Sequence, residues 1–135
     1  MLKGLTKYRD EGLLLLRIGI GLSYILLHGG PKLLGGPETW YQVGGAISSV
    51  GIEMGFVFWG LLAALAETLG GLLLIFGWFF RPALLLLLIS MLVATLMQID
   101  AGEDWASVVA HPLKMAILFF CWLFIGPGRM SIDGK

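Results

Sequence analysis

The sequence predicts an all-α integral membrane protein, a four-helix bundle with a short interfacial segment between its first and second helices. Of the 135 residues, 58% are hydrophobic and 13% are charged. Soluble domains are roughly 45–50% apolar and about a quarter charged, so an ordinary soluble fold is disfavoured. The mean hydropathy is +0.90. Four apolar runs recur, each near the length of about 20 residues that a membrane helix requires.

The four runs cover residues 12–34, 55–80, 83–98 and 105–126, within one membrane domain over residues 1–135. The first run follows a basic amino terminus, but it is too long for a signal peptide and lacks a cleavage site, so we expect a retained helix. Residues 37–53 mix aromatic and aliphatic positions with glycines. This mixture predicts a segment along the membrane surface and leaves open its helicity and a role as a lid.

The charges exclude some functions and predict an orientation. Nine basic and nine acidic residues cancel, which removes the basic field that nucleic-acid binding needs. The single cysteine, Cys121, supplies neither a disulfide nor a thiolate metal cage, and no metal site is predicted. Cytoplasmic loops are enriched in Lys and Arg, and six of these residues fall on the side of the two termini against Lys32 alone opposite. The six are Lys3, Lys7, Arg9, Arg81, Arg129 and Lys135. Both termini are therefore expected in the cytoplasm.

Polar side chains within the runs are the candidate site residues, because an ionisable group in a bilayer needs a partner or water. Arg17, Tyr24, His28 and Lys32 fall within a wedge of roughly 80° on the first helix. Glu67 is the only charge in the second run, and small residues around it predict a tight helix seam. In the fourth run His111 and Lys114 are one turn apart. Pro112 between them should free the carbonyl of Val108.

Depth along the helices predicts that these groups meet. Counting about 1.5 Å per residue from the inferred outer ends, His28 and His111 lie roughly 6 and 8 Å deep, and Lys114 and Glu67 roughly 12 and 15 Å. We therefore expect an outward-opening polar pocket with a Glu67–Lys114 ion pair, Arg17 being the rival partner. The catalytic candidates are Glu67, His28 and His111. The candidates for cofactor binding are Tyr24, Lys32, Lys114, Gln98 and Arg17.

Each candidate also has a purely structural interpretation. A buried ion pair of Glu67 can serve only to fix helix packing. The histidines can hydrogen-bond to the backbone without a ligand, and Arg17 and Lys32 can extend toward the membrane surface. A haem clamped by His28 and His111 is disfavoured, because no groove of small residues accompanies them. Cys121 is expected to be a packing residue.

Three stretches resemble the DoxX family of small bacterial and archaeal membrane proteins. They are LLRIGIGLSYILLHGGPKLLGG, AALAETLGGLLLIFGWFFRPALLLL and the terminal GPGRMSID. The positions that match the family pattern are Arg17, His28, Gly29, Lys32, Glu67, Gly70, Gly71, Gly126, Pro127, Gly128 and Arg129. The resemblance implies a four-helix protein of a bacterial or archaeal cytoplasmic membrane. Some relatives are linked to quinone-dependent oxidation of sulfur compounds or to membrane oxidoreductase assemblies.

The expected function is therefore a quinone-associated oxidoreductase, or a subunit of one. A quinone ring is apolar with two carbonyl acceptors, and it suits apolar walls with a few donors. No nucleotide-binding fingerprint or cysteine cluster is present, so electrons would come through a partner membrane or peripheral subunit. One alternative is a non-enzymatic accessory subunit that stabilises a larger complex. Another is a pathway for a small solute or protons. The exposed lateral surface of such a thin bundle also allows a homo-oligomer.

Overall fold

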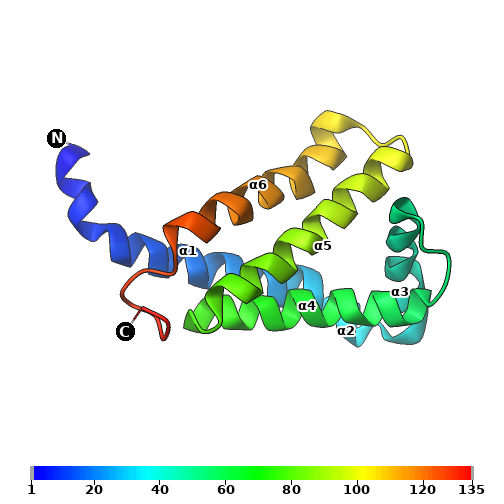
Figure 1. The fold of residues 1–135 in the computed structure, drawn as a ribbon, viewed down its shortest axis with the longest axis horizontal. Helices are drawn as coiled ribbons and strands as arrows, with labels where there is room; N and C mark the ends of the chain where they lie inside the picture. The colour runs from blue at the N-terminus through cyan, green and yellow to red at the C-terminus, as the bar shows by residue number, and fades with distance from the viewer. Residues whose placement is uncertain (1, 135) are drawn as a thin grey trace.

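The computed structural model describes residues 2–134, and four of its helices are long and apolar enough to cross a membrane (Figure 1). The first span, Leu2–Leu34, is continuous and bends through short irregular turns. The elements in chain order are η1 (Leu2–Tyr8), α1 (Arg9–Ser23), the π-helical turn η2 (Tyr24–Gly29), α2 (Gly30–Leu34), α3 (Gly36–Gly44), η3 (Gly45–Val50), α4 (Phe56–Phe76), α5 (Phe80–Asp100), the π-helical turn η4 (Trp105–Val109) and α6 (Ala110–Ile125).

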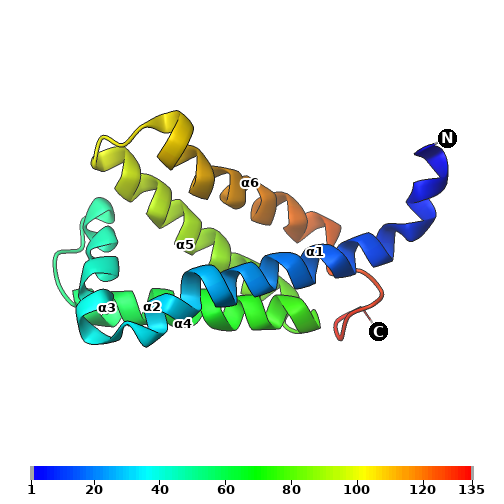
Figure 2. The same cartoon turned by 180° about the vertical axis from the view of Figure 1, so that it is seen from behind.

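Helix α4 is the centre of the bundle. It packs against α1, α3 and α5, whereas α6 packs on α5. Both termini and the turn between α4 and α5 lie at one end of the molecule, called here the terminal end (Figures 1 and 2). Helix α3 and the connection from α5 to α6 lie at the other end, called here the α3 end. A core of large side chains from α4, α5 and α6 fills the middle, including Leu74, Phe80, Leu87, Phe119 and Trp122.

The observed helix boundaries correct two of the expected ones. Helix α4 ends at Phe76 rather than near residue 80, because Gly77 adopts a positive φ of 63° and closes the helix. Helix α5 begins at Phe80 rather than at residue 83. Pro82 lies in its first turn, where the missing N–H of proline would have no helical partner anyway. The segment expected at the membrane surface is helical as α3 and η3.

Glycines allow the backbones to approach closely on two sides of α4. A Cβ added to Gly21 would lie 2.5 Å from the carbonyl oxygen of Gly71, so α1 and α4 touch through their main chains. A Cβ added to Gly60 would overlap the carbonyl group of Trp40 in α3. Glu67 is buried in the seam that these glycines form. The tight seam predicted around Glu67 is therefore confirmed.

The two π-helical turns both precede prolines. In η2 the irregular hydrogen bond runs from the N–H of Gly30 to the carbonyl of Ile25, and Pro31 follows directly. At η4 the N–H of Val109 donates to the carbonyl of Asp104 over 3.1 Å, and Pro112 follows. Proline supplies no N–H to the preceding turn, so the helical hydrogen bonds shift locally. Each irregular stretch carries or adjoins one of the two histidines.

Candidate functional site

The deepest polar contact at the α3 end joins Lys32 to Glu67. Nζ of Lys32 lies 2.9 Å from both Oε1 and Oε2 of Glu67. The side chain of Glu67 is 4% exposed and that of Lys32 is 31% exposed. Gly29 brings the first span against α4 at this level, because a Cβ there would lie 2.5 Å from the backbone nitrogen of Thr68. This close approach of the two backbones at Gly29 brings Lys32 of α2 within reach of Glu67 of α4.

The expected Glu67–Lys114 pair is wrong, and side-chain direction explains why. Helical side chains lean toward the amino terminus of their own helix. Lys32 therefore leans from the α3 end toward the interior, and Glu67 leans toward the α3 end, so the two meet. Lys114 leans toward the α3 end as Glu67 does, but it stands on an exposed face of α6 and not on the face that packs inside the bundle. It is exposed on α6, and it makes no hydrogen bond or ion pair with any other residue within 2–134.

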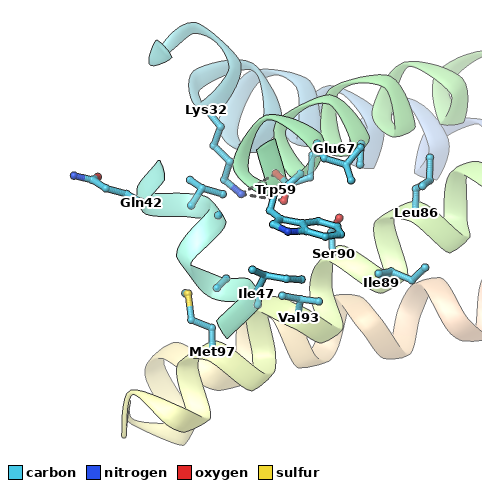
Figure 3. A pocket seen from close by; sticks show the side chains of 17 residues that line it. Lys32, Gln42, Ile47, Trp59, Glu67, Leu86, Ile89, Ser90, Val93 and Met97 are labelled. Carbon is cyan, nitrogen blue, oxygen red and sulfur yellow. Dashed lines mark hydrogen bonds and ion pairs between the residues drawn. The ribbon is translucent and has the colours of Figure 1, made fainter. Parts of the chain in front are cut away.

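A cavity of about 430 Å³ lies beside the Lys32–Glu67 pair (Figure 3). Helices α4 and α5 form its walls, and α3 with η3 covers the α3 end. Most lining residues are aliphatic, and Trp59 from α4 is its aromatic wall. The polar exceptions beside the ion pair are Ser90 of α5 and Gln42 of α3. The cavity is thus an apolar chamber with one charged edge.

The histidines and Tyr24 form a separate ring cluster that does not line this cavity. The ring centroids of Tyr24 and His28 are 5.0 Å apart, and those of His28 and His111 are 5.8 Å apart in a stacked arrangement. Tyr24 also packs on Phe119 at 5.5 Å. The single polar pocket expected from the sequence is therefore not what the structure shows: Lys32 and Glu67 lie at an apolar cavity, the rings of Tyr24, His28 and His111 lie apart from it, and Lys114 joins neither group.

Arg17 and Gln98 do not line the cavity. Arg17 points toward the terminal end, but it is buried by protein rather than extended to the membrane surface. Its Nη1 donates to the carbonyl of Ile75 at 2.9 Å, and its Nη2 donates to the carbonyl of Met130. Gln98 is half-buried, and its Oε1 has no hydrogen-bond partner within the described part of the chain. Its neighbour Met97 lines the cavity instead.

Sequence reasoning missed the cavity walls. Neither Trp59 nor Ser90 is among the site residues that the sequence predicts. A signal was present in the third run, where Leu86, Ser90, Val93 and Met97 recur at helical spacing and all four line the cavity. The cover of α3 and η3 had no comparable signal. Its attachment depends on Trp40, whose Nε1 donates to the carbonyl of Lys32 over 3.0 Å.

The site combines an apolar volume with a small number of hydrogen-bond donors. An ammonium group has three donors, and the carboxylate of Glu67 occupies those on one side of Lys32. The volume falls within the range of roughly 300–1,000 Å³ that is typical of small-molecule pockets. Within residues 2–134 no group of three or more His, Cys, Asp or Glu side chains is placed to hold a metal ion. The geometry suits a flat, mostly apolar molecule that carries hydrogen-bond acceptors.

Comparison with known proteins identifies the family. The family model of DoxX matches residues 12–99, which include Lys32, Glu67 and every lining residue of the cavity. This chain belongs to the DoxX family. A protein of Haemophilus influenzae that is described as uncharacterized is 30% identical over 139 aligned positions, covering 99% of this chain and 97% of that protein. No solved structure matches this DoxX chain. The matched region ends before α6, so His111 and Lys114 lie outside it.

Proposed function

We propose that this DoxX protein binds a quinone in the cavity beside Lys32 and Glu67 and serves as the quinone-binding membrane subunit of an oxidoreductase. The observation that carries the proposal is an apolar chamber within the membrane spans whose edge is one buried ion pair. An apolar ring fits the aliphatic walls and Trp59. Its carbonyl oxygens need donors, and an ammonium and a hydroxyl are at hand on Lys32 and Ser90.

The residues of this chain would bind, orient and exchange protons. A bound quinone supplies two-electron redox chemistry and takes up two protons when it is reduced. Lys32 holds a proton on Nζ at the cavity wall, and Glu67 fixes that ammonium in place through both carboxylate oxygens. Ser90 offers a second donor from α5. A partner membrane or peripheral oxidoreductase subunit is proposed as the source of the electrons.

His28 and His111 are proposed to exchange protons between this site and the surface. His111 is exposed at the start of α6, and its ring stacks on that of His28. Histidine changes charge near neutral pH, which suits it to proton exchange. Because neither ring lines the cavity, their proposed role is to return a proton to the Lys32 side of the site rather than to contact the ligand.

The membrane orientation is part of the same proposal. The terminal end carries Lys3, Lys7, Arg9, Arg81 and Arg129, and Lys135 lies outside the described residues. Cytoplasmic segments are enriched in such residues, so we place the terminal end in the cytoplasm of a bacterial or archaeal cell. The cavity then lies toward the outer leaflet. Lysine labelling of intact cells from outside would test this placement, with modification of Lys3 or Lys7 contradicting it.

Quinone extraction from purified protein tests the binding proposal. The full chain is purified in mild detergent from quinone-containing membranes, extracted with organic solvent and analysed by chromatography. We expect near-stoichiometric quinone in the wild type. Val93→Trp should abolish it by filling the cavity, whereas Leu96→Trp, on an exposed position of α5 that does not line the cavity, should retain it. Equal amounts of quinone in the two variants would reject the proposal. So would a wild-type protein that contains no quinone as purified and binds none after ubiquinone-1 is added.

A non-enzymatic accessory subunit is the second candidate. The observation in its favour is the large exposed apolar surface of α5 and α6, with side chains such as Phe120 and Phe124 more than half exposed. An empty cavity together with a fixed membrane partner would support this function over quinone binding. A solute or proton pathway has less support, because Arg17 and the carboxyl-terminal segment pack the terminal end.

A further inference from the structure

Lys114 is a cation halfway along a membrane span, and no acidic side chain of residues 2–134 forms an ion pair with it. It is the tenth of the 21 residues of the span Trp105–Ile125 and the only charged residue among them. Its side chain is exposed, and it forms no hydrogen bond or ion pair with the rest of residues 2–134. Lysines near helix ends reach the membrane surface, but the centre of a span is too deep for this escape.

The surface around Lys114 has the character of a helix-binding face. Helix α6 packs on α5 and η4 and touches the first span through His111 and Phe119, whereas its face with Lys114 is uncovered within the described chain. Lys114, Ile117, Cys121 and Phe124 recur at helical spacing, and all four are exposed. Beside this stripe, an apolar groove of about 250 Å³ between α5 and α6 is lined by residues such as Leu92 and Phe120. Apolar side chains of a neighbouring helix fit such a groove.

We propose that this face of α6 binds a transmembrane helix of a different membrane protein, and that an Asp or Glu of that helix pairs with Lys114. The charge of Lys114 selects the partner, since a carboxylate at the same depth removes the cost of an isolated cation in the membrane. The groove beside it supplies the packing. The interface is independent of the quinone-binding proposal, because it uses none of the cavity residues.

A second copy of this chain does not provide the required partner. A symmetric contact through the same face places Lys114 opposite Lys114, which is repulsive. Within residues 2–134, Glu67 is the only carboxylate well inside a span, and Lys32 already binds it. The other acidic residues of the spans, Asp10, Glu11 and Asp100, lie near span ends. A different protein with an acidic residue at mid-depth remains the occupant that fits.

Photocrosslinking in native membranes tests this interface. The photoreactive amino acid p-benzoylphenylalanine replaces Ile117, which is 57% exposed on the stripe, or Leu15, which is 70% exposed on α1 and serves as the control position. We expect Ile117 to form an adduct with another membrane protein. The adduct should fall roughly tenfold or more in Lys114→Gln and persist in Lys114→Arg, because only the latter keeps the charge. The Leu15 position should give no adduct that depends on Lys114.

Peptide mapping and a charge exchange complete the test. The crosslinked segment should carry an Asp or Glu within one helical turn of the attachment point. Lys114→Glu should abolish the adduct, and changing that acidic residue to Lys in the partner should restore it. The proposal is overturned if the adduct forms only with a second copy of this chain or only with lipid. It is also overturned if the crosslinked segment lacks a carboxylate, or if Lys114→Gln leaves the amount of adduct unchanged. A lower unfolding temperature of purified Lys114→Gln would overturn it too, because it would reveal a partner for Lys114 within this chain.

Discussion

Two cations of the first span, Arg17 and Lys32, lie in opposite surroundings. Arg17 is 1% exposed, and its guanidinium donates to carbonyls of Leu74, Ile75 and Met130. All of these acceptors are fixed backbone atoms at the terminal end. A Cβ on Gly77 would lie 2.7 Å from Nη1 of Arg17, so there is no room for another molecule. Arg17 therefore ties α1, α4 and the carboxyl-terminal segment together.

Lys32 differs in both its partner and its surroundings. Its acceptor is the carboxylate of Glu67, a titratable group, and its side chain remains 31% exposed beside a cavity. Every hydrogen bond that Arg17 makes goes to a backbone carbonyl in a filled core, which fits a role in stabilising the fold, and its Nε has no partner within the described residues. A cation paired with one carboxylate at the edge of a cavity keeps a donor for a ligand. We therefore expect the terminal end to stabilise the fold and the α3 end to hold the proposed ligand.

Removing Arg17 should have the largest effect on stability. Arg17→Met removes the side-chain donor of the carbonyls of Ile75 and Met130 and one of the two donors of the Leu74 carbonyl, and we expect the free energy of unfolding to fall by about 3 kcal/mol. Unfolding of the purified protein by a denaturing detergent measures this loss. Arg129→Met is the control, because that side chain is 90% exposed, and it should change stability little. Equal stability of the two variants would contradict a structural role for Arg17.

Breaking the Lys32–Glu67 pair should separate stability from binding. Glu67→Gln leaves the ammonium of Lys32 without its counter-charge, and we expect a loss of about 2 kcal/mol in the free energy of unfolding. The double variant Lys32→Met with Glu67→Met should recover to within about 1 kcal/mol of the wild type, because both charges are gone. It should still bind no quinone in the extraction assay. A double variant that binds quinone normally would show that the pair serves packing alone.

Moving the cover of the cavity should have a smaller effect on stability and a clear one on binding. Gly60→Ala forces the carbonyl of Trp40 away from α4, and overpacking of this kind costs about 1–2 kcal/mol. Quinone occupancy should also fall, since α3 and η3 cover the cavity. Gly45→Ala is the matched control, because its Cβ would meet nothing within 4 Å. Both glycine variants are compared by detergent unfolding and by quinone extraction. Unchanged quinone occupancy in Gly60→Ala would show that α3 and η3 do not contribute to quinone binding.

The smallest effect is expected at Asp104, which caps the π-helical turn η4 at the α3 end and does not line the cavity. Its Oδ2 accepts hydrogen bonds from the N–H of Ser107 at 2.9 Å and from the hydroxyl of Ser107 at 2.8 Å. These bonds lower the pKa of Asp104 from its ordinary value of 3.8. The cap is therefore present above pH 3.8 and is lost as the pH falls through the lower value of the folded state. Asp104→Asn should reduce the unfolding temperature slightly at pH 7 and flatten its acid dependence. An unchanged acid dependence would contradict the cap.

Local signals predicted those features that depend on one helix or on one helix surface. The four spans follow from the lengths of the apolar runs, and the seam at Glu67 follows from the glycines around it. The partner of Glu67 could not be predicted by counting depth, because that estimate ignores the direction in which each side chain leans. Lys32 is closer to the end of its span than Lys114 is, yet its lean toward the interior brings it to Glu67.

The sequence by itself determined the all-α membrane architecture, the place of a buried carboxylate in a glycine-rich seam and the membership of the DoxX family. Hydrophobicity and residue size act within each helix, so their pattern is readable along the chain. Only the tertiary structure decided which cation pairs with Glu67, where the cavity lies and that Lys114 remains uncovered. These outcomes depend on the rotation and relative height of helices that are distant in sequence, and small residues at their contacts set both through main-chain approach.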